Sequence, residues 1–138
     1  MFVVGVNANT SHVNEYTLST GFDVSTASHV DAHNVFSEEK DPRGVAFNSD
    51  GTKMFVVGRT NNGDDKAYVN EYTLSTGFDV STASHVDGFL IESQENLPTG
   101  LAFSNDGTKM FVVGNTGDDV NEYTLSTGFD VSTASFID

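Results

Sequence analysis

Short apolar segments recur along the chain and are separated by turns rich in Gly, Asp, Asn and Ser. MFVVG (54–58) is apolar throughout, which is typical of a strand covered on both faces. VNEYTLS (69–75) alternates in character and is rich in residues that favour strands. A shorter run, GVAF (44–47), precedes them, and a fourth begins near TASHVD (82–87). This pattern predicts four short strands, and Gly and β-branched residues are too dense for helices.

The segments between these strands have the composition of tight turns. Asp50-Gly51 predicts a hairpin between the first and second strands. STGFDVST (75–82) joins the third and fourth strands, and here we expect Gly77 to supply a positive φ while Ser, Thr and Asp form local turns. Asp23, Asp79 and Asp130 occupy the same position in three copies of this loop, so we expect them to accept turn-stabilising hydrogen bonds.

The chain repeats itself. VNEYTLSTGFDVSTAS occurs three times unchanged, at 13–28, 69–84 and 120–135, and MFVVG occurs at 1–5, 54–58 and 110–114. A period of about 50 residues is typical of propeller blades. We therefore predict an all-β chain of about three four-stranded blades, divided into an incomplete blade lacking its first strand with its connection, a complete blade, and a blade with a shortened last strand (1–43, 44–99 and 100–138).

A meander of four strands cannot cover two apolar faces by itself and must stack on its neighbours. A propeller is favoured over a sandwich because MFVVG does not alternate, and a solenoid with unusually long coils is the alternative. The stretch P-x-G-[VL]-A-F-x-x-D-G-T-K-M-F-V-V-G, at 42–58 and 98–114, resembles the blades of NHL, YVTN and lactonase-like propellers. That resemblance implies the propeller fold, and those families have six or seven blades in one chain.

About three blades are too few to close a ring, because known propellers have at least about four. We expect copies of the chain to self-associate into a closed ring, with a dimer favoured and a trimer as the alternative. A second interpretation is that the chain is a piece of a longer open reading frame, and the two are compatible.

Charge restricts the partners. The 138 residues include 6 Lys and Arg against 20 Asp and Glu, giving a net charge of −14. This charge repels nucleic acids and anionic membranes, so neither is expected as a partner. There is no cysteine, no apolar run approaches a membrane span, and the N-terminus lacks the pattern of a signal peptide. The acidity suits a saline or extracellular setting.

Differences between the copies concentrate in two kinds of connection, which an antiparallel meander places on one edge of the sheets. We call it the variable edge: the connections between second and third strands, and those between units (6–12, 59–68 and 115–119; 32–43 and 88–99). Loops on a rigid scaffold commonly carry recognition, although looser packing alone also explains the differences. The candidate residues for binding an unknown protein or glycan are Asn9, His12, His33, Arg43, Arg59, Asn61, Asp64, Asp65, Tyr68, Asn115 and Asp118.

Catalytic patterns are poor. GxSxG, a P-loop and histidines at metal-site spacing are missing from the sequence. His29 and His85 are equivalent to Phe136, which favours a packing position over a ligand. Gly63-Asp64-Asp65 and Gly117-Asp118-Asp119 could hold Ca²⁺, but solvated acidic turns are the favoured interpretation. We expect no cofactor, no metal and no catalytic residue, and hence a non-catalytic binding or structural module. The resemblance implies one alternative, a fragment of a lactonase-like hydrolase that is inactive in isolation.

Two further positions repeat in all three copies. Glu15, Glu71 and Glu122 lie in the third-strand segment, and threefold repetition argues against a catalytic acid. We expect them at blade edges or between blades. Phe22, Phe78 and Phe129 lie beside the turn aspartates, and we expect them to pack on the outer hairpin.

Overall fold

The computed structural model is an all-β protein, and it describes residues 1–7, 10–60 and 66–138. These residues form three antiparallel sheets, with no α-helix among them. The first sheet contains β1 (Phe2–Asn7), β2 (Thr10–Leu18) and β3 (Ala27–Asn34). The second contains β4 (Asp41–Phe47), β5 (Lys53–Thr60), β6 (Lys66–Leu74) and β7 (Ala83–Leu90). The third contains β8 (Pro98–Phe103), β9 (Lys109–Gly114), β10 (Val120–Leu125) and β11 (Ala134–Phe136).

Each sheet is a simple meander in which every strand pairs with the next one along the chain. The expected order of four strands is confirmed in the second and third sheets, and the first sheet contains three strands, the first of which includes most of its MFVVG segment. β4 begins at Asp41, three residues before the predicted GVAF. A register shift between Pro42 and Gly44 allows this extension, because proline cannot donate a ladder hydrogen bond.

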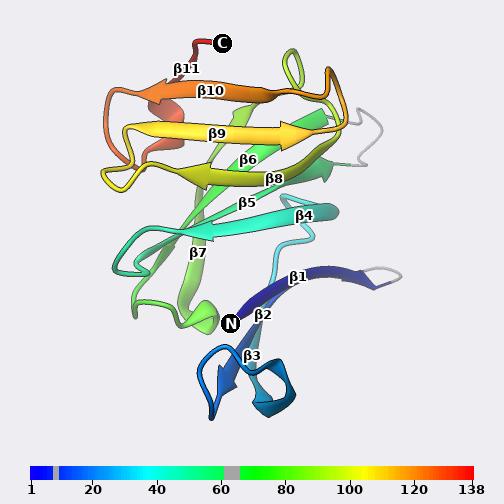
Figure 1. Ribbon diagram of the computed structural model, residues 1–138, viewed down its shortest axis with the longest axis vertical. Coiled ribbons are helices and arrows are strands. Elements are labelled where there is room, and N and C mark those ends of the chain that lie inside the picture. Colours follow the sequence, from blue (N-terminus) through cyan, green and yellow to red (C-terminus); the bar gives the residue numbers. More distant parts are fainter. Residues whose placement is uncertain (8–9, 61–65) are drawn as a thin grey trace.

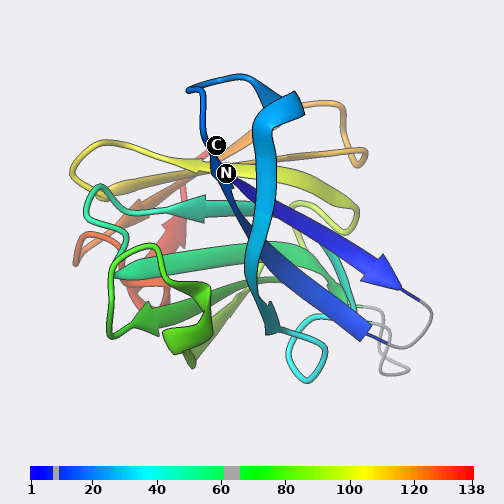
Figure 2. The same ribbon diagram turned by 90° about the horizontal axis from the view of Figure 1, so that it is seen from below.

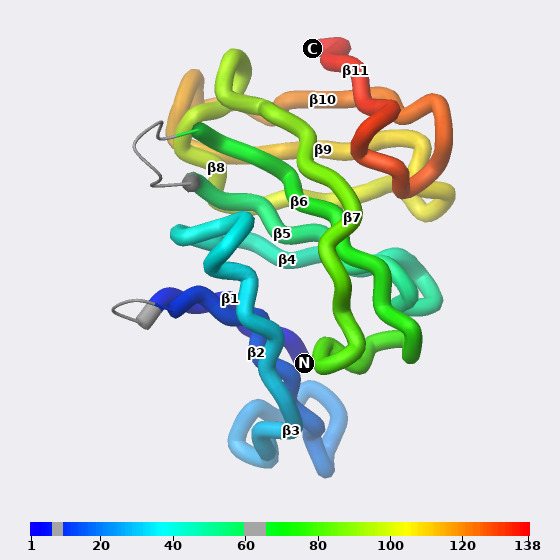
Figure 3. The backbone as a smooth tube through the Cα atoms, turned by 180° about the vertical axis from the view of Figure 1, so that it is seen from behind, coloured from blue at the N-terminus to red at the C-terminus, as the bar shows by residue number. Residues whose placement is uncertain are grey.

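The second sheet lies between the other two (Figure 1). On one face of β5, Met54 and Val56 pack in a core shared with Val13 of the first sheet. On the other face, Phe55 and Val57 pack in a core shared with residues of the third sheet. The interpretation of MFVVG as a strand covered on both faces is confirmed for β5, whereas Met1, Val3 and Val113 of the other two copies are exposed. The first and third sheets lie at opposite ends of the molecule, as the view from behind also shows (Figure 3). Seen from below, the first sheet lies in front of the other two (Figure 2).

A single 3-10 turn follows the third strand of each repeat: η1 (Val24–Thr26), η2 (Val80–Thr82) and η3 (Val131–Thr133). The preceding aspartate caps each turn, as expected. Asp79 Oδ1, for example, accepts hydrogen bonds from the backbone N–H of Ser81 at 3.1 Å and from its hydroxyl at 2.6 Å.

The expected role of Gly77 in this loop is wrong. The positive φ belongs to the following residue, Phe78, at 64°, as it does to its repeat equivalents Phe22 and Phe129. Glycine is needed for a different reason: a Cβ on Gly77 would overlap the carbonyl oxygen of Asp50. The loop therefore packs directly on the Asp50-Gly51 hairpin, which is present as predicted and has Gly51 at φ 72°.

Candidate functional site

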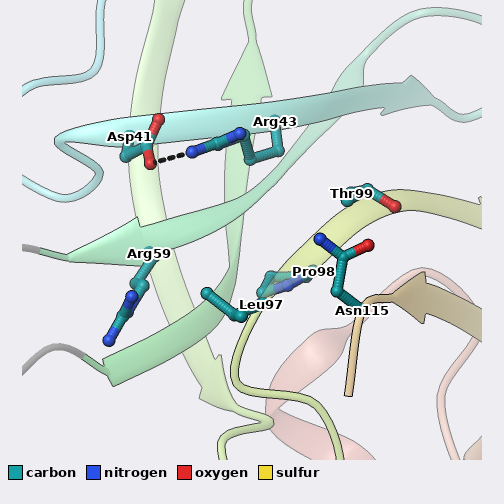
Figure 4. A pocket seen from close by; sticks show the side chains of 7 residues that line it. All are labelled: Asp41, Arg43, Arg59, Leu97, Pro98, Thr99 and Asn115. Atoms are coloured by element: carbon teal, nitrogen blue, oxygen red, sulfur yellow. Dashed lines mark hydrogen bonds and ion pairs between the residues drawn. The ribbon is translucent and has the colours of Figure 1, made fainter. Parts of the chain in front are cut away.

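A small pocket opens at the variable edge, where the second and third sheets meet (Figure 4). It encloses about 80 Å³, enough for a few water molecules or one small polar group. The second sheet contributes the first residues of β4 and the last part of β5, and the third sheet contributes the start of β8 and the residue after β9. The lining residues are Asp41, Arg43, Arg59, Leu97, Pro98, Thr99 and Asn115.

Close approach of the two inner strands brings these residues together. A Cβ on Gly44 of β4 would lie 3.1 Å from the Cα of Gly100 of β8, so glycine permits the contact. Each glycine directly follows a lining residue, Arg43 in one sheet and Thr99 in the other. A backbone hydrogen bond from the N–H of Asn115 to the carbonyl of Leu97, 3.1 Å long, holds the third-sheet side of the pocket.

The pocket is the most basic place in an acidic chain. Both arginines of the sequence line it, among six basic residues in all. Arg43 Nη2 donates to Asp41 Oδ2 at 2.6 Å, and this contact raises the pKa of the Arg43 guanidinium. Because a guanidinium carries five N–H donors, this one bond leaves most of the Arg43 fork available. Arg59, near the end of β5, also lines the pocket, and its side chain extends away from Arg43 and Asn115 (Figure 4).

Two buried carboxylates support the backbone around the pocket. Glu39 Oε1 accepts from the N–H of Asp41 at 3.2 Å, and Glu95 Oε1 accepts from the N–H of Leu97 at 2.6 Å. Glu95 also accepts from the N–H of Thr116, at 3.1 Å to Oε2. Each carboxylate thus orders the connection that carries one lining residue.

The surroundings of Glu39 are less polar than those of a usual carboxylate. Its side chain is fully buried, and Oε2 has no hydrogen-bond partner among the described residues. Burial raises the pKa of Glu39 to about 8. Glu39 is therefore protonated at neutral pH, since a buried carboxylate with few donors is more stable as the neutral acid.

The structure brings three of the predicted residues together, namely Arg43, Arg59 and Asn115. His12 and His33 lie in the first sheet, away from the pocket, and the His33 ring makes an edge contact with Tyr72 at 5.5 Å. Burial lowers the pKa of His33, as expected for a packed imidazole.

Two further predicted residues that the structure describes, Tyr68 and Asp118, do not line the pocket. Tyr68 lies within β6 opposite Gly58, and Asp118 lies in an exposed turn at φ 55°. Four candidates lie outside the described residues: Asn9, Asn61, Asp64 and Asp65.

The interpretation of His29 and His85 as packing positions is confirmed. Their rings make edge contacts at 5.3 Å with Tyr16 and Tyr72, and Phe136 makes the equivalent contact with Tyr123 at 5.6 Å. A histidine and a phenylalanine are interchangeable here because both rings pack at a steep angle against a tyrosine ring.

Sequence reasoning missed Asp41, Leu97, Pro98 and Thr99 as lining residues and missed the two buried carboxylates. A signal for the carboxylates was present. The connections between units differ in almost every residue, yet both contain Glu-x-x-Pro, at 39–42 and 95–98. A shared acid in an otherwise divergent segment indicates a structural task.

Among residues 1–7, 10–60 and 66–138, the side chains of His, Asp and Glu form no group of three that could hold a metal ion. In the same part of the chain, no helix has the length and apolar character required to cross a membrane. No family model, curated protein or solved structure matches the chain.

Proposed function

We propose that the protein is a non-catalytic binding module that recognises a partner through its variable edge. The observation that carries this proposal is the convergence of Arg43, Arg59 and Asn115 on one pocket between two sheets. In a chain with a net charge of −14, both arginines of the sequence occupy this single place.

The donors around the pocket suit a carboxylate group on the partner. Guanidinium N–H groups form forked, charge-assisted hydrogen bonds with carboxylates, and the amide of Asn115 adds neutral donors. The volume of about 80 Å³ admits such a group. The partner, a protein or a glycan, would therefore insert one carboxylate and lie across the edge.

We also infer that the three sheets are successive blades of a β-propeller and that self-association completes the ring. Support comes from the two sheet–sheet interfaces, which use the same pairs of repeat-equivalent residues. Phe2 stacks on Phe78 at one interface, with ring centroids 6.2 Å apart, and Phe55 stacks on Phe129 at the other, at 6.1 Å. Repetition of one geometric relation between successive units is how a ring is built.

Titration with galacturonate tests the binding function, and its uncharged methyl ester is the matched control. We expect galacturonate to shift the backbone amide resonances of residues 41, 43, 59, 97 and 99, with a dissociation constant on the order of millimolar. Arg43→Gln and Arg59→Gln should each weaken binding by roughly tenfold or more. Lys40→Gln removes the same charge from outside the pocket and should leave binding unchanged.

The proposal fails if the ester binds as well as the acid, or if the shifts lie at the hairpin edge. If Lys40→Gln weakened galacturonate binding as much as the arginine variants, the proposal would also be wrong, because the ligand would then respond to the overall charge of the protein and not to the pocket.

A further inference from the structure

One carboxylate connects the second sheet to the third. Glu71 Oε2 accepts from the N–H of Val131, the first residue of η3, at 3.0 Å. Its Oε1 accepts from Lys53 Nζ at 2.6 Å, and the same ammonium donates to the carbonyl of Phe129 at 2.6 Å. The pair Lys53–Glu71 therefore binds the turn of the neighbouring sheet through two backbone groups.

The first and second sheets repeat the arrangement. Glu15 Oε2 accepts from the N–H of Val80, the first residue of η2, at 3.2 Å. The expectation that the repeated glutamates lie between units is confirmed for Glu15 and Glu71. The phenylalanines beside the turn pack on their own hairpin as expected, Phe78 on Gly51 and Phe129 on Gly107. Each also contacts a phenylalanine of the neighbouring sheet.

The third sheet presents the same pair without a neighbour. Lys109 and Glu122 form an ion pair equivalent to Lys53–Glu71. The Glu122 side chain is 29% exposed, whereas the Glu71 side chain is 3% exposed. On the same face, Val113 and Val120 are exposed, although their equivalents Val57 and Val69 are fully buried.

The first sheet presents the complementary turn without a neighbour. Phe22 is fully exposed, and Val24 is 71% exposed where Val80 and Val131 are fully buried. Around this turn is a wide, mainly apolar hollow of about 460 Å³, lined by Met1, Leu18, Gly21, Phe22 and Val24. Met1 and Val3 are also exposed here, whereas their equivalents Met54 and Val56 are fully buried.

We propose that the third sheet of one copy stacks on the first sheet of a second copy of this chain. By analogy with the two internal interfaces, Glu122 accepts from the N–H of Val24, Lys109 donates to the carbonyl of Phe22, and the ring of Phe111 packs on the ring of Phe22. The inference rests on the blade arrangement proposed above, and it assigns the surface and the partner that complete the ring.

The contact is head to tail, so its two surfaces lie on different sheets of each copy. Two copies would bring six sheets together, which is within the range of closed propellers. The repeats are identical over the third strand and the turn that follows it, so the second copy meets at this turn the same side chains that already pair inside each molecule.

Complementation between two variants tests the proposal. A head variant, Phe22→Ser with Val24→Asp, removes the apolar turn. A tail variant, Lys109→Glu with Glu122→Lys, keeps the internal ion pair but points an ammonium at the N–H of the partner. We expect the wild type to have two or three times the chain mass of 14.8 kDa in solution. Each variant alone should be a monomer, with association weakened by about 100-fold or more.

Mixing the two variants should restore a complex of one copy of each, because the head variant keeps its tail surface and the tail variant keeps its head surface. Val30→Ser with Val86→Ser removes exposed apolar groups elsewhere and should leave assembly intact. Phe22→Ser alone, at a fully exposed position, tests the head surface if the double variant is poorly folded by circular dichroism.

A monomeric wild type, variants that stay oligomeric, or variants that fail to recombine would each overturn the proposal. The outcome is separable from the binding function, because galacturonate titration can be carried out on the monomeric head variant with its pocket unchanged. If the wild type is a monomer and binds galacturonate, the proposed binding function holds and only the proposed self-association is wrong.

Discussion

At the scale of single residues, identical side chains have different tasks because the repeats place them differently. Glu71 is buried between two sheets and receives an ammonium and a backbone N–H, whereas Glu122 has the same sequence neighbours and lies at an open face. The chain therefore contains its own matched controls. Differences between equivalent substitutions measure the environment alone, since local sequence is constant.

Glu71→Gln should lower the free energy of unfolding by about 1–3 kcal/mol, because Lys53 loses a buried charged acceptor. Glu122→Gln should change it by no more than about 0.5 kcal/mol, as expected of an exposed ion pair. Urea denaturation in the head-variant background, which removes any effect of assembly, provides the measurement. Equal losses for the two substitutions would contradict the assigned interface.

The raised pKa of Glu39 implies that the stability of the protein depends on pH. Its pKa is about 8 in the folded protein, above the value of about 4.3 for an unfolded glutamate. Its stabilising contribution is therefore complete below about pH 4.3 and is lost as the pH rises toward 8, by up to about 1.4 kcal/mol per unit.

Glu39→Gln should remove this slope, so the variant gains stability relative to wild type as the pH rises from 5 to 8. Denaturant midpoints across that range measure the difference. Glu92→Gln, a half-buried acid in the next connection, is the control for lost negative charge. Parallel pH profiles for wild type and Glu39→Gln would show that the burial of this carboxylate has no energetic consequence.

At the scale of elements, each four-stranded meander is held at one edge by packing between two turns. The loop containing Gly77 rests on the hairpin of its own sheet at the carbonyl of Asp50, and Gly128 rests on Asp106 in the same way. Gly21 belongs to the sheet that contains three described strands, and no described heavy atom lies within 4 Å of where its Cβ would be.

Gly77→Ala and Gly128→Ala should each destabilise the protein by about 1–3 kcal/mol, because the methyl group would push the two turns apart. Gly21→Ala should be neutral or stabilising by up to about 1 kcal/mol, through reduced entropy of the unfolded chain. Thermal denaturation of the three variants and the wild type measures these differences in stability. A loss at Gly21 equal to that at Gly77 would show that backbone conformation, not contact with the hairpin, requires glycine.

The strands could be predicted because their signals are local. MFVVG and VNEYTLS carry the residue types of covered and half-covered strands, and Asp-Gly marks the hairpin between the first and second strands. The role of Gly77 could not be predicted, since it depends on a contact with a residue 27 positions earlier. A glycine that permits close approach and a glycine that adopts a positive φ look the same in a sequence.

The pocket was predictable only in part. The sequence could place three residues on the same edge, Arg43, Arg59 and Asn115, because an antiparallel meander brings alternate connections to one edge. Their convergence was not predictable, because it depends on the distance between Gly44 and Gly100 in neighbouring sheets. Likewise, the edge position of His33 suggested recognition, but its contact with Tyr72 across sheets required the stacking to be known.

At the scale of the whole molecule, each sheet stacks on the next in the same way. The second sheet is covered on both faces, and the outer faces of the first and third sheets expose side chains whose equivalents are buried. Exposed apolar surface of this extent marks an interaction site. The net charge of −14 opposes association of two copies, so assembly should strengthen with added salt.

The molar mass of the unmodified chain in solution tests this account most directly. Sedimentation equilibrium at concentrations from about 1 to 100 μM, in buffer of about 0.15 M ionic strength, covers the affinities typical of specific interfaces. We predict a discrete species of twice the chain mass of 14.8 kDa that dissociates on dilution. A single species of 14.8 kDa at every concentration would contradict the account.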